Sequence, residues 1–209
     1  METTKNDRVF FNCEMRSQKD EEHGTYISGR PIVYDSIYDN GYFKETIDRG
    51  ALDGCDLKDV KFLVNHNTNM IPLARSRNNN KNSTMQLSPC DEGMDMRVNL
   101  DIENNSDARS LNSAVERGDI SGMSFMFTID GEEWEGLDSD YPTRHITKIS
   151  KVFEVSAVTF PAYEDTTLTA RSKSVLDNAR STLDSAKKNN SDDNTLELLK
   201  LKNQILGGI

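Results

Sequence analysis

Three side chains with complementary chemistry stand far apart in this sequence: the imidazole of His66, the hydroxyl of Ser124 and the carboxylate of Glu154. Each lies in, or at the end of, a short apolar run that is typical of a β-strand. An imidazole can accept the proton of a hydroxyl group, whose oxygen then attacks a carbonyl carbon, and a carboxylate can orient and stabilise the imidazolium that forms. If the three runs converge in space, the sequence predicts hydrolysis through a serine nucleophile.

The serine is assigned as the nucleophile from the alternation of side chains around it. On a strand, the large apolar residues at odd positions from Met123 to Phe127 share one face, and Ser124 points to the other. Gly122 allows another backbone or a substrate to approach closely. Ser121 is the alternative nucleophile, although its position has the parity of the apolar face. We therefore expect Ser124 to face the site while its neighbours fill the core.

The third member of the constellation is left open between two residues. Glu154 lies in the mostly apolar run 152–158, where burying an unpaired carboxylate would be costly. His66 is one suitable partner for it, and a salt bridge with a nearby lysine or arginine is the alternative. His145 is the second candidate, because a neutral histidine can also orient an imidazole.

Composition and motif spacing argue against several other kinds of function. The net charge of -10 disfavours nonspecific binding to nucleic acid, which requires a basic surface. No histidine or cysteine spacing typical of a metal site occurs, so we expect no metal and no cofactor. Cys13, Cys55 and Cys90 are widely spaced and odd in number, which favours free thiols in a reducing compartment. Without a signal peptide or a membrane-spanning stretch, the protein is expected to be soluble and intracellular.

The elements that must position these residues indicate a mainly β domain of about seven or eight strands. Alternation is clearest over 94–102, where every second residue is apolar. Residues 42–49 are expected to form a short helix, and 106–117 have helical periodicity, with Asn105 or Ser106 as the N-cap. This mixture favours an antiparallel barrel or sandwich with flanking helices, an α+β arrangement, over βαβ units. The strands expected are 8–17, 25–34, 59–65, 69–75, 83–88, 94–102, 119–129 and 144–160.

The composition changes after about residue 170. Residues 172–186 carry a narrow apolar stripe at helical spacing, and a charged, Asn-rich linker follows at 187–194. A Leu-rich helix is predicted over 195–206. We therefore divide the chain into a body, residues 1–170, and a polar helical tail, residues 171–209.

Six short segments occur in the order in which one known family carries them, spread over roughly residues 8–170. They are Gly41–Leu52, Leu63–Asn67, Pro72–Ser76, Gly118–Phe127, Arg144–Ile146 and Phe153–Tyr163. Through these segments the chain resembles the prohead, or capsid maturation, proteases of tailed bacteriophages, whose fold is related to that of the herpesvirus assemblin proteases. The resemblance departs at Leu52, where the family has phenylalanine, and at Met126, where it usually has a small residue.

The resemblance implies an antiparallel β-barrel of the assemblin type and a role for each candidate. His66 would be the general base and Ser124 the nucleophile that becomes acylated. Glu154 matches the family's Glu-Val-Ser segment, whereas assemblin-type enzymes use a second histidine, so His145 stays open as the third member. Backbone N–H groups are the usual oxyanion donors and leave no sequence signal. Arg144 or the loop 131–136 is the candidate contributor here.

The resemblance also implies where the enzyme acts and on what. It predicts cleavage of scaffold segments or capsid-protein precursors inside the immature shell, in the host cytoplasm, and cleavage of the enzyme itself. The tail 171–209 would target the enzyme into the shell or be removed by self-cleavage. The assemblin relationship further implies that a homodimer supports activity.

Two functions of other kinds compete with this interpretation. A non-enzymatic scaffold or capsid-assembly protein would account for the acidic charge, the polar loops and the C-terminal helices. It would be indifferent to changes at His66 and Ser124. A hydrolase of another substrate class, such as an esterase of the α/β-hydrolase fold, would be expected to carry Gly-x-Ser-x-Gly, which this chain lacks.

Overall fold

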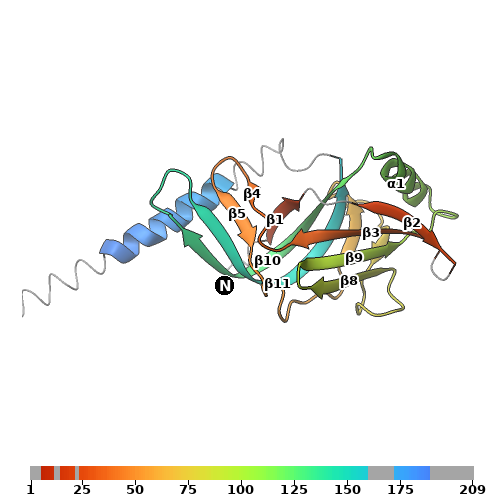
Figure 1. Cartoon of the computed structure of the whole chain (residues 1–209), viewed down its shortest axis with the longest axis horizontal. Helices are drawn as coiled ribbons and strands as arrows, with labels where there is room; N and C mark the ends of the chain where they lie inside the picture. Colours follow the sequence, from red (N-terminus) through yellow and green to blue (C-terminus); the bar gives the residue numbers. More distant parts are fainter. Residues whose placement is uncertain (1–5, 12–14, 22–23, 160–171, 189–209) are drawn as a thin grey trace, which may run out of the picture.

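The computed structural model is mainly β, with two helices in the part of the chain that it describes (Figure 1). Its strands form a seven-stranded and a four-stranded sheet. The expected class, a mainly β body with flanking helices, is therefore confirmed. The backbone is described for residues 6–11, 15–21, 24–159 and 172–188, and side chains from residue 15 onward within these ranges.

The larger sheet is built around two long strands, β10 and β11, which pair antiparallel as a hairpin. β1 lies on the free edge of β10. The other edge of β11 pairs in parallel with β5 along its first half and with β6 along its second half. β4 extends the sheet beyond β5, and β7 extends it beyond β6. The bounds are β1 Asn6–Phe11, β4 Tyr38–Asp39, β5 Lys44–Ile47, β6 Lys61–Val64, β7 Ala74–Arg75, β10 Gly122–Glu135 and β11 Thr143–Val158.

The smaller sheet is antiparallel, in the order β2-β3-β9-β8. Its strands are β2 Arg16–Asp20, β3 Gly24–Val33, β8 Met85–Cys90 and β9 Gly93–Asn99. Alternate apolar side chains of both sheets belong to one core cluster. From the large sheet they include Phe62, Phe125, Phe127, Val155 and Ala157, and from the small sheet Ile27, Met85, Met94, Met96 and Val98.

The prediction of an antiparallel barrel is confirmed only in that the protein is mainly β. The described strands form two open sheets rather than a closed barrel, and the larger sheet is mixed because β5 and β6 run parallel to β11. Period-2 alternation reports that one face of a strand is buried, but it carries no information on the direction of the neighbouring strand. The helix expected over 42–49 is also wrong. These residues contain β5, whose pairing with β11 outweighs any local helical preference.

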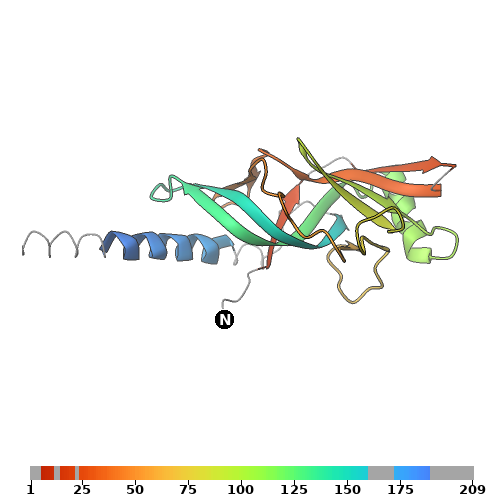
Figure 2. The same cartoon turned by 90° about the horizontal axis from the view of Figure 1, so that it is seen from below.

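The two helices flank the sheets at different places. α1, Ser106–Arg117, has the predicted bounds, with Asn105 accepting hydrogen bonds from the N–H groups of Asp107 and Ala108. It leads into β10. A second helix spans residues 172–188 and lies beside the outer end of the β10–β11 hairpin (Figures 1 and 2). The Leu-rich helix expected over 195–206 lies outside the described residues. No helix in the described part has the length and apolar character needed to cross a bilayer.

Candidate active site

His66 stands in a tight turn directly after β6. Asn65 and His66 both have a positive φ, 50° and 55°, which is uncommon for residues other than glycine. The turn is fastened to β11. The Asn65 N–H donates to the carbonyl oxygen of Ala157 at 2.9 Å, and the Thr159 N–H donates to Asn65 Oδ1 at 2.9 Å. The neighbouring strand therefore holds the histidine in a conformation that the isolated turn would rarely adopt.

The Glu154 carboxylate lies against this histidine. Its side chain is 3% exposed, and its Oε1 is hydrogen-bonded to Nδ1 of His66. Its other oxygen, Oε2, accepts a hydrogen bond of 2.5 Å from Oγ of Ser156. The same Ser156 oxygen accepts the backbone N–H of His66 at 3.1 Å. The three residues thus form a closed ring of contacts in which both carboxylate oxygens are occupied.

Strand pairing brings Ser124 next to these three residues. It lies directly opposite Ser156 in the β10–β11 ladder, and the next residue on its face, Met126, lies opposite Glu154. Side chains directly opposite on antiparallel strands project from the same face, with Cβ atoms about 4.5–5.5 Å apart. Ser124 therefore projects from the same face as Ser156 and Glu154. Its neighbours Met123, Phe125 and Phe127 point into the core, as the alternation predicts.

The serine is enclosed in this structure. Ser124 and Ser156 are both 0% exposed, and the His66 side chain is 11% exposed. A hydroxyl group so enclosed is shielded from bulk water, which strengthens the electrostatic interactions around it.

The alternative candidates lie elsewhere. Ser121 precedes β10 and is exposed to solvent. His145 is nine residues before Glu154 on β11, which is roughly 30 Å along an extended strand. Its Nδ1 is 3.0 Å from Oδ1 of Asp48, and its Nε2 is 3.6 Å from a carboxylate oxygen of Glu135. The structure therefore does not bring His145 to His66.

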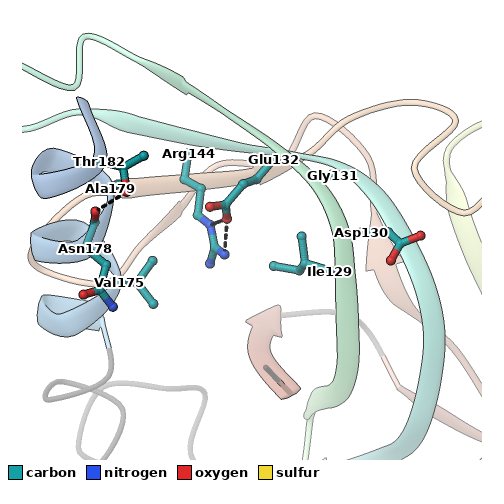
Figure 3. Close-up of a pocket in the computed structure, with 9 residues that line it drawn as sticks. All are labelled: Ile129, Asp130, Gly131, Glu132, Arg144, Val175, Asn178, Ala179 and Thr182. Carbon is teal, nitrogen blue, oxygen red and sulfur yellow. Dashed lines mark hydrogen bonds and ion pairs between the residues drawn. The ribbon is translucent and has the colours of Figure 1, made fainter. Parts of the chain in front are cut away.

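Residues 131–136 are not the expected loop, because residues 131–135 are the last part of β10 and pair with β11. They and Arg144 are also distant from Ser124 along the hairpin. Arg144 is buried at the outer part of the hairpin, where it donates to Glu45 at 2.9 Å and to Glu132 at 2.7 Å. It lines a cavity of about 320 Å³ between the hairpin and helix 172–188 (Figure 3). In Figure 3, Arg144 and Glu132 come from the hairpin, and the helix closes the opposite side with Val175, Asn178, Ala179 and Thr182. Neither Arg144 nor the segment 131–136 is placed to stabilise an oxyanion at Ser124.

Two of the three cysteines lie in the described part of the chain. Cys55 and Cys90 are both free, and Cys13 lies outside the residues whose structure is described. Burial raises the pKa of the Cys55 thiol to about 11, so this side chain stays protonated at neutral pH. Among the described residues, no cluster of three or more histidine, cysteine or acidic side chains is arranged to hold a metal ion.

Ser156 is the residue of this site that sequence reasoning missed. It stands two positions after Glu154, so both side chains must share one face of a strand. That spacing was a usable signal. What the sequence did not reveal is that β6 and β10 would be the neighbours of β11 at this point.

A sequence model of the caudovirus prohead serine protease family matches residues 11–180. The chain belongs to this family. It is therefore a prohead serine protease that acts in capsid assembly or maturation. The match runs ten residues past the predicted body boundary at 170, into helix 172–188.

A search of solved structures found similarity to the capsid assembly protease gp21 of bacteriophage T4. The two share 14% sequence identity with a TM-score of 0.41, over 74% of this chain and 99% of that chain. No curated protein sequence matches the chain.

Proposed function

We propose that His66, Ser124 and Glu154 are the catalytic triad of this prohead protease. The observation that carries the proposal is the hydrogen bond between His66 Nδ1 and the buried Glu154 carboxylate. The position of Ser124, directly opposite Ser156 on the same sheet face, supports its assignment as the nucleophile. In this arrangement His66 is the general base and Glu154 orients it.

The proposed reaction follows from these positions. Nε2 of His66 accepts the proton of Ser124 as its Oγ attacks the carbonyl carbon of the scissile peptide bond. The imidazolium, stabilised by Glu154, then gives that proton to the leaving amine, and the C–N bond breaks. An acyl-enzyme on Ser124 remains. Water, deprotonated by the same Nε2, attacks this ester and releases the new carboxyl end, and the proton returns to Ser124.

The substrates we propose are segments of the scaffold or of the capsid-protein precursor, and the enzyme's own chain. Membership of a prohead protease family supports this, because such an enzyme must act where the shell is assembled. The site of action is then the interior of the prohead. Residues 1–170 form the catalytic body in this proposal, and 171–209 are the segment that is lost by self-cleavage or targets the enzyme. Homodimerisation stays a prediction.

The proposal is tested by co-expressing the full chain with its capsid precursor. Ser124→Ala is expected to abolish processing, since loss of a triad member typically lowers the rate by about 10⁴–10⁶. Ser121→Ala is the matched control and is expected to cleave normally. The intact mass of the enzyme, followed in the same samples, should fall with time only when Ser124 is present. Unchanged processing by Ser124→Ala would refute the assignment, and loss in Ser121→Ala would transfer the role.

A further inference from the structure

One hydroxyl group lies between the two residues that prepare the nucleophile. Oγ of Ser156 donates its only proton to Glu154 Oε2 at 2.5 Å and accepts the backbone N–H of His66 at 3.1 Å. The side chain is fully buried, so water is not available to replace either contact. A single side chain thus fixes both partners of the His66–Glu154 hydrogen bond.

The contact with His66 acts on the backbone. At a φ of 55°, His66 is in a region that a residue with a Cβ rarely occupies, and such conformations persist only when their surroundings hold them. The preceding residue is held separately, because the Asn65 side chain donates to Thr159 Oγ1 at 3.0 Å and accepts the Thr159 N–H. The Ser156 hydroxyl group holds the backbone of His66 itself, through the His66 N–H.

The contact with Glu154 acts on the carboxylate. The last torsion of a glutamate side chain is broad and roughly two-fold, so the plane of the carboxylate is set by its hydrogen bonds. With Oε2 bound to Ser156, Oε1 faces Nδ1 of His66. A buried carboxylate also needs its remaining lone pairs satisfied, which an imidazole alone does not achieve.

We propose that Ser156 is a positioning residue of the protease. It orients the Glu154 carboxylate and the His66 backbone together, so that the imidazole presents Nε2 toward Ser124. The proposal rests on the proposed triad and deepens it. Ser156 itself is not the nucleophile in this scheme, because its proton is committed to Glu154.

The test uses a matched pair of variants in the full-length protein, Ser156→Thr and Ser156→Val. The two new side chains have the same shape, and only threonine keeps a hydroxyl group. The substrate is a peptide spanning the cleavage site mapped in the co-expressed capsid precursor. We expect Ser156→Val to lower kcat on the order of 10²-fold relative to Ser156→Thr, the effect of a misplaced catalytic group, with KM close to unchanged. Ser156→Thr should retain most of the wild-type kcat.

A spectroscopic readout accompanies the kinetics. The proton on His66 Nδ1, hydrogen-bonded to a carboxylate, should give a far-downfield signal in the wild-type protein and in Ser156→Thr. It should broaden or disappear in Ser156→Val. Equal kcat values and equal signals in the two variants would overturn the positioning role, provided that Ser124→Ala is inactive. An active Ser124→Ala protein would instead refute the triad.

If neither larger side chain is accommodated in this buried position, Ser156→Ala decides the question. A kcat on the order of 10²-fold below wild type with KM unchanged, and label from a fluorophosphonate still on Ser124, would support the proposal. A wild-type kcat in Ser156→Ala would overturn it.

Discussion

The Glu154 carboxylate determines which ring nitrogen of His66 carries the proton. An ionised carboxylate can only accept hydrogen bonds, so Nδ1 must be the donor in the contact between them. In a neutral imidazole this leaves Nε2 unprotonated and able to accept a proton. In the proposed triad, the basicity of Nε2 therefore depends on the Glu154 atom that faces Nδ1 being an oxygen that accepts a hydrogen bond.

Glu154→Gln tests this dependence. A glutamine amide can donate to Nδ1, which favours the tautomer with the proton on Nε2 and removes the base. We expect the rate of precursor cleavage to fall by about 10⁴, as for the corresponding change in other serine proteases. Glu133→Gln, at an exposed position of β10, is the matched control and should cleave normally. A Glu154→Gln enzyme within about tenfold of the wild-type rate would contradict the role of the carboxylate.

At the scale of elements, the site is produced by the two neighbours of β11. β6 pairs in parallel with it and ends with Val64 opposite Ala157, which delivers the His66 turn beside Ser156. β10 pairs antiparallel and sets Ser124 opposite Ser156. A shift of one residue in either ladder would turn the side chains to the other face of the sheet. Register, rather than any single strand, therefore brings the triad candidates together.

This explains how much of the site was predictable from the sequence. The residue types, the strand around Ser124 and the orientation of its apolar neighbours all follow from local alternation. The parallel pairing of β5 and β6 does not, because strands of the same pattern can be joined in either direction by long connections. The bond from Ser156 to His66 was hidden for the same reason, since it joins residues that are 90 positions apart.

The ion pair between His145, in the first half of β11, and Asp48 predicts that the stability of the protein depends on pH. The hydrogen bond to Asp48 raises the pKa of His145 above its ordinary value of 6.5, with Glu135 adding to the effect. The stabilisation is therefore complete below about pH 6.5 and is lost as the pH rises through the folded-state pKa. Being partly exposed, the pair should contribute about 0.2–1 kcal/mol.

The measurement is urea unfolding of the Ser124→Ala protein at about pH 6 and about pH 8.5, with and without Asp48→Asn. Asp48→Asn should reduce the free energy of unfolding at the lower pH and have little effect on this pair at the higher one. If Asp48→Asn lowered stability equally at both pH values, the assigned titration of His145 would be wrong.

At the scale of the whole molecule, Figure 2 shows helix 172–188 beside the outer end of the β10–β11 hairpin. The strand bounds and pairing put the triad candidates toward the other end of this hairpin. Ser124 is near the start of β10. At the other end, Arg180 of helix 172–188 donates to the carbonyl oxygens of Leu137 and Ser139, at 3.2 Å and 2.6 Å, and Leu176 is buried. Helix 172–188 therefore packs on the end of the hairpin. It takes no part in the hydrogen bonds that join His66, Glu154 and Ser156.

Deleting residues 172–209 tests whether the helix contributes to stability without contributing to catalysis. Catalysis should persist within about threefold, because sites that share no partners act independently. The free energy of unfolding should fall by about 1.5–3 kcal/mol, the typical value of burying one leucine side chain. Peptide cleavage and urea unfolding of the truncated protein would show both effects. A loss of cleavage as complete as that in Ser124→Ala would mean that the helix is needed for the active conformation.

The most direct test of the central claim is to identify the nucleophile chemically. The purified full-length protein is treated with a fluorophosphonate, digested and mapped by mass spectrometry. The triad predicts one modified residue, Ser124, and predicts that His66→Asn abolishes the modification. A label on Ser121 or Ser156, or labelling of Ser124 at the wild-type rate without His66, would contradict the account.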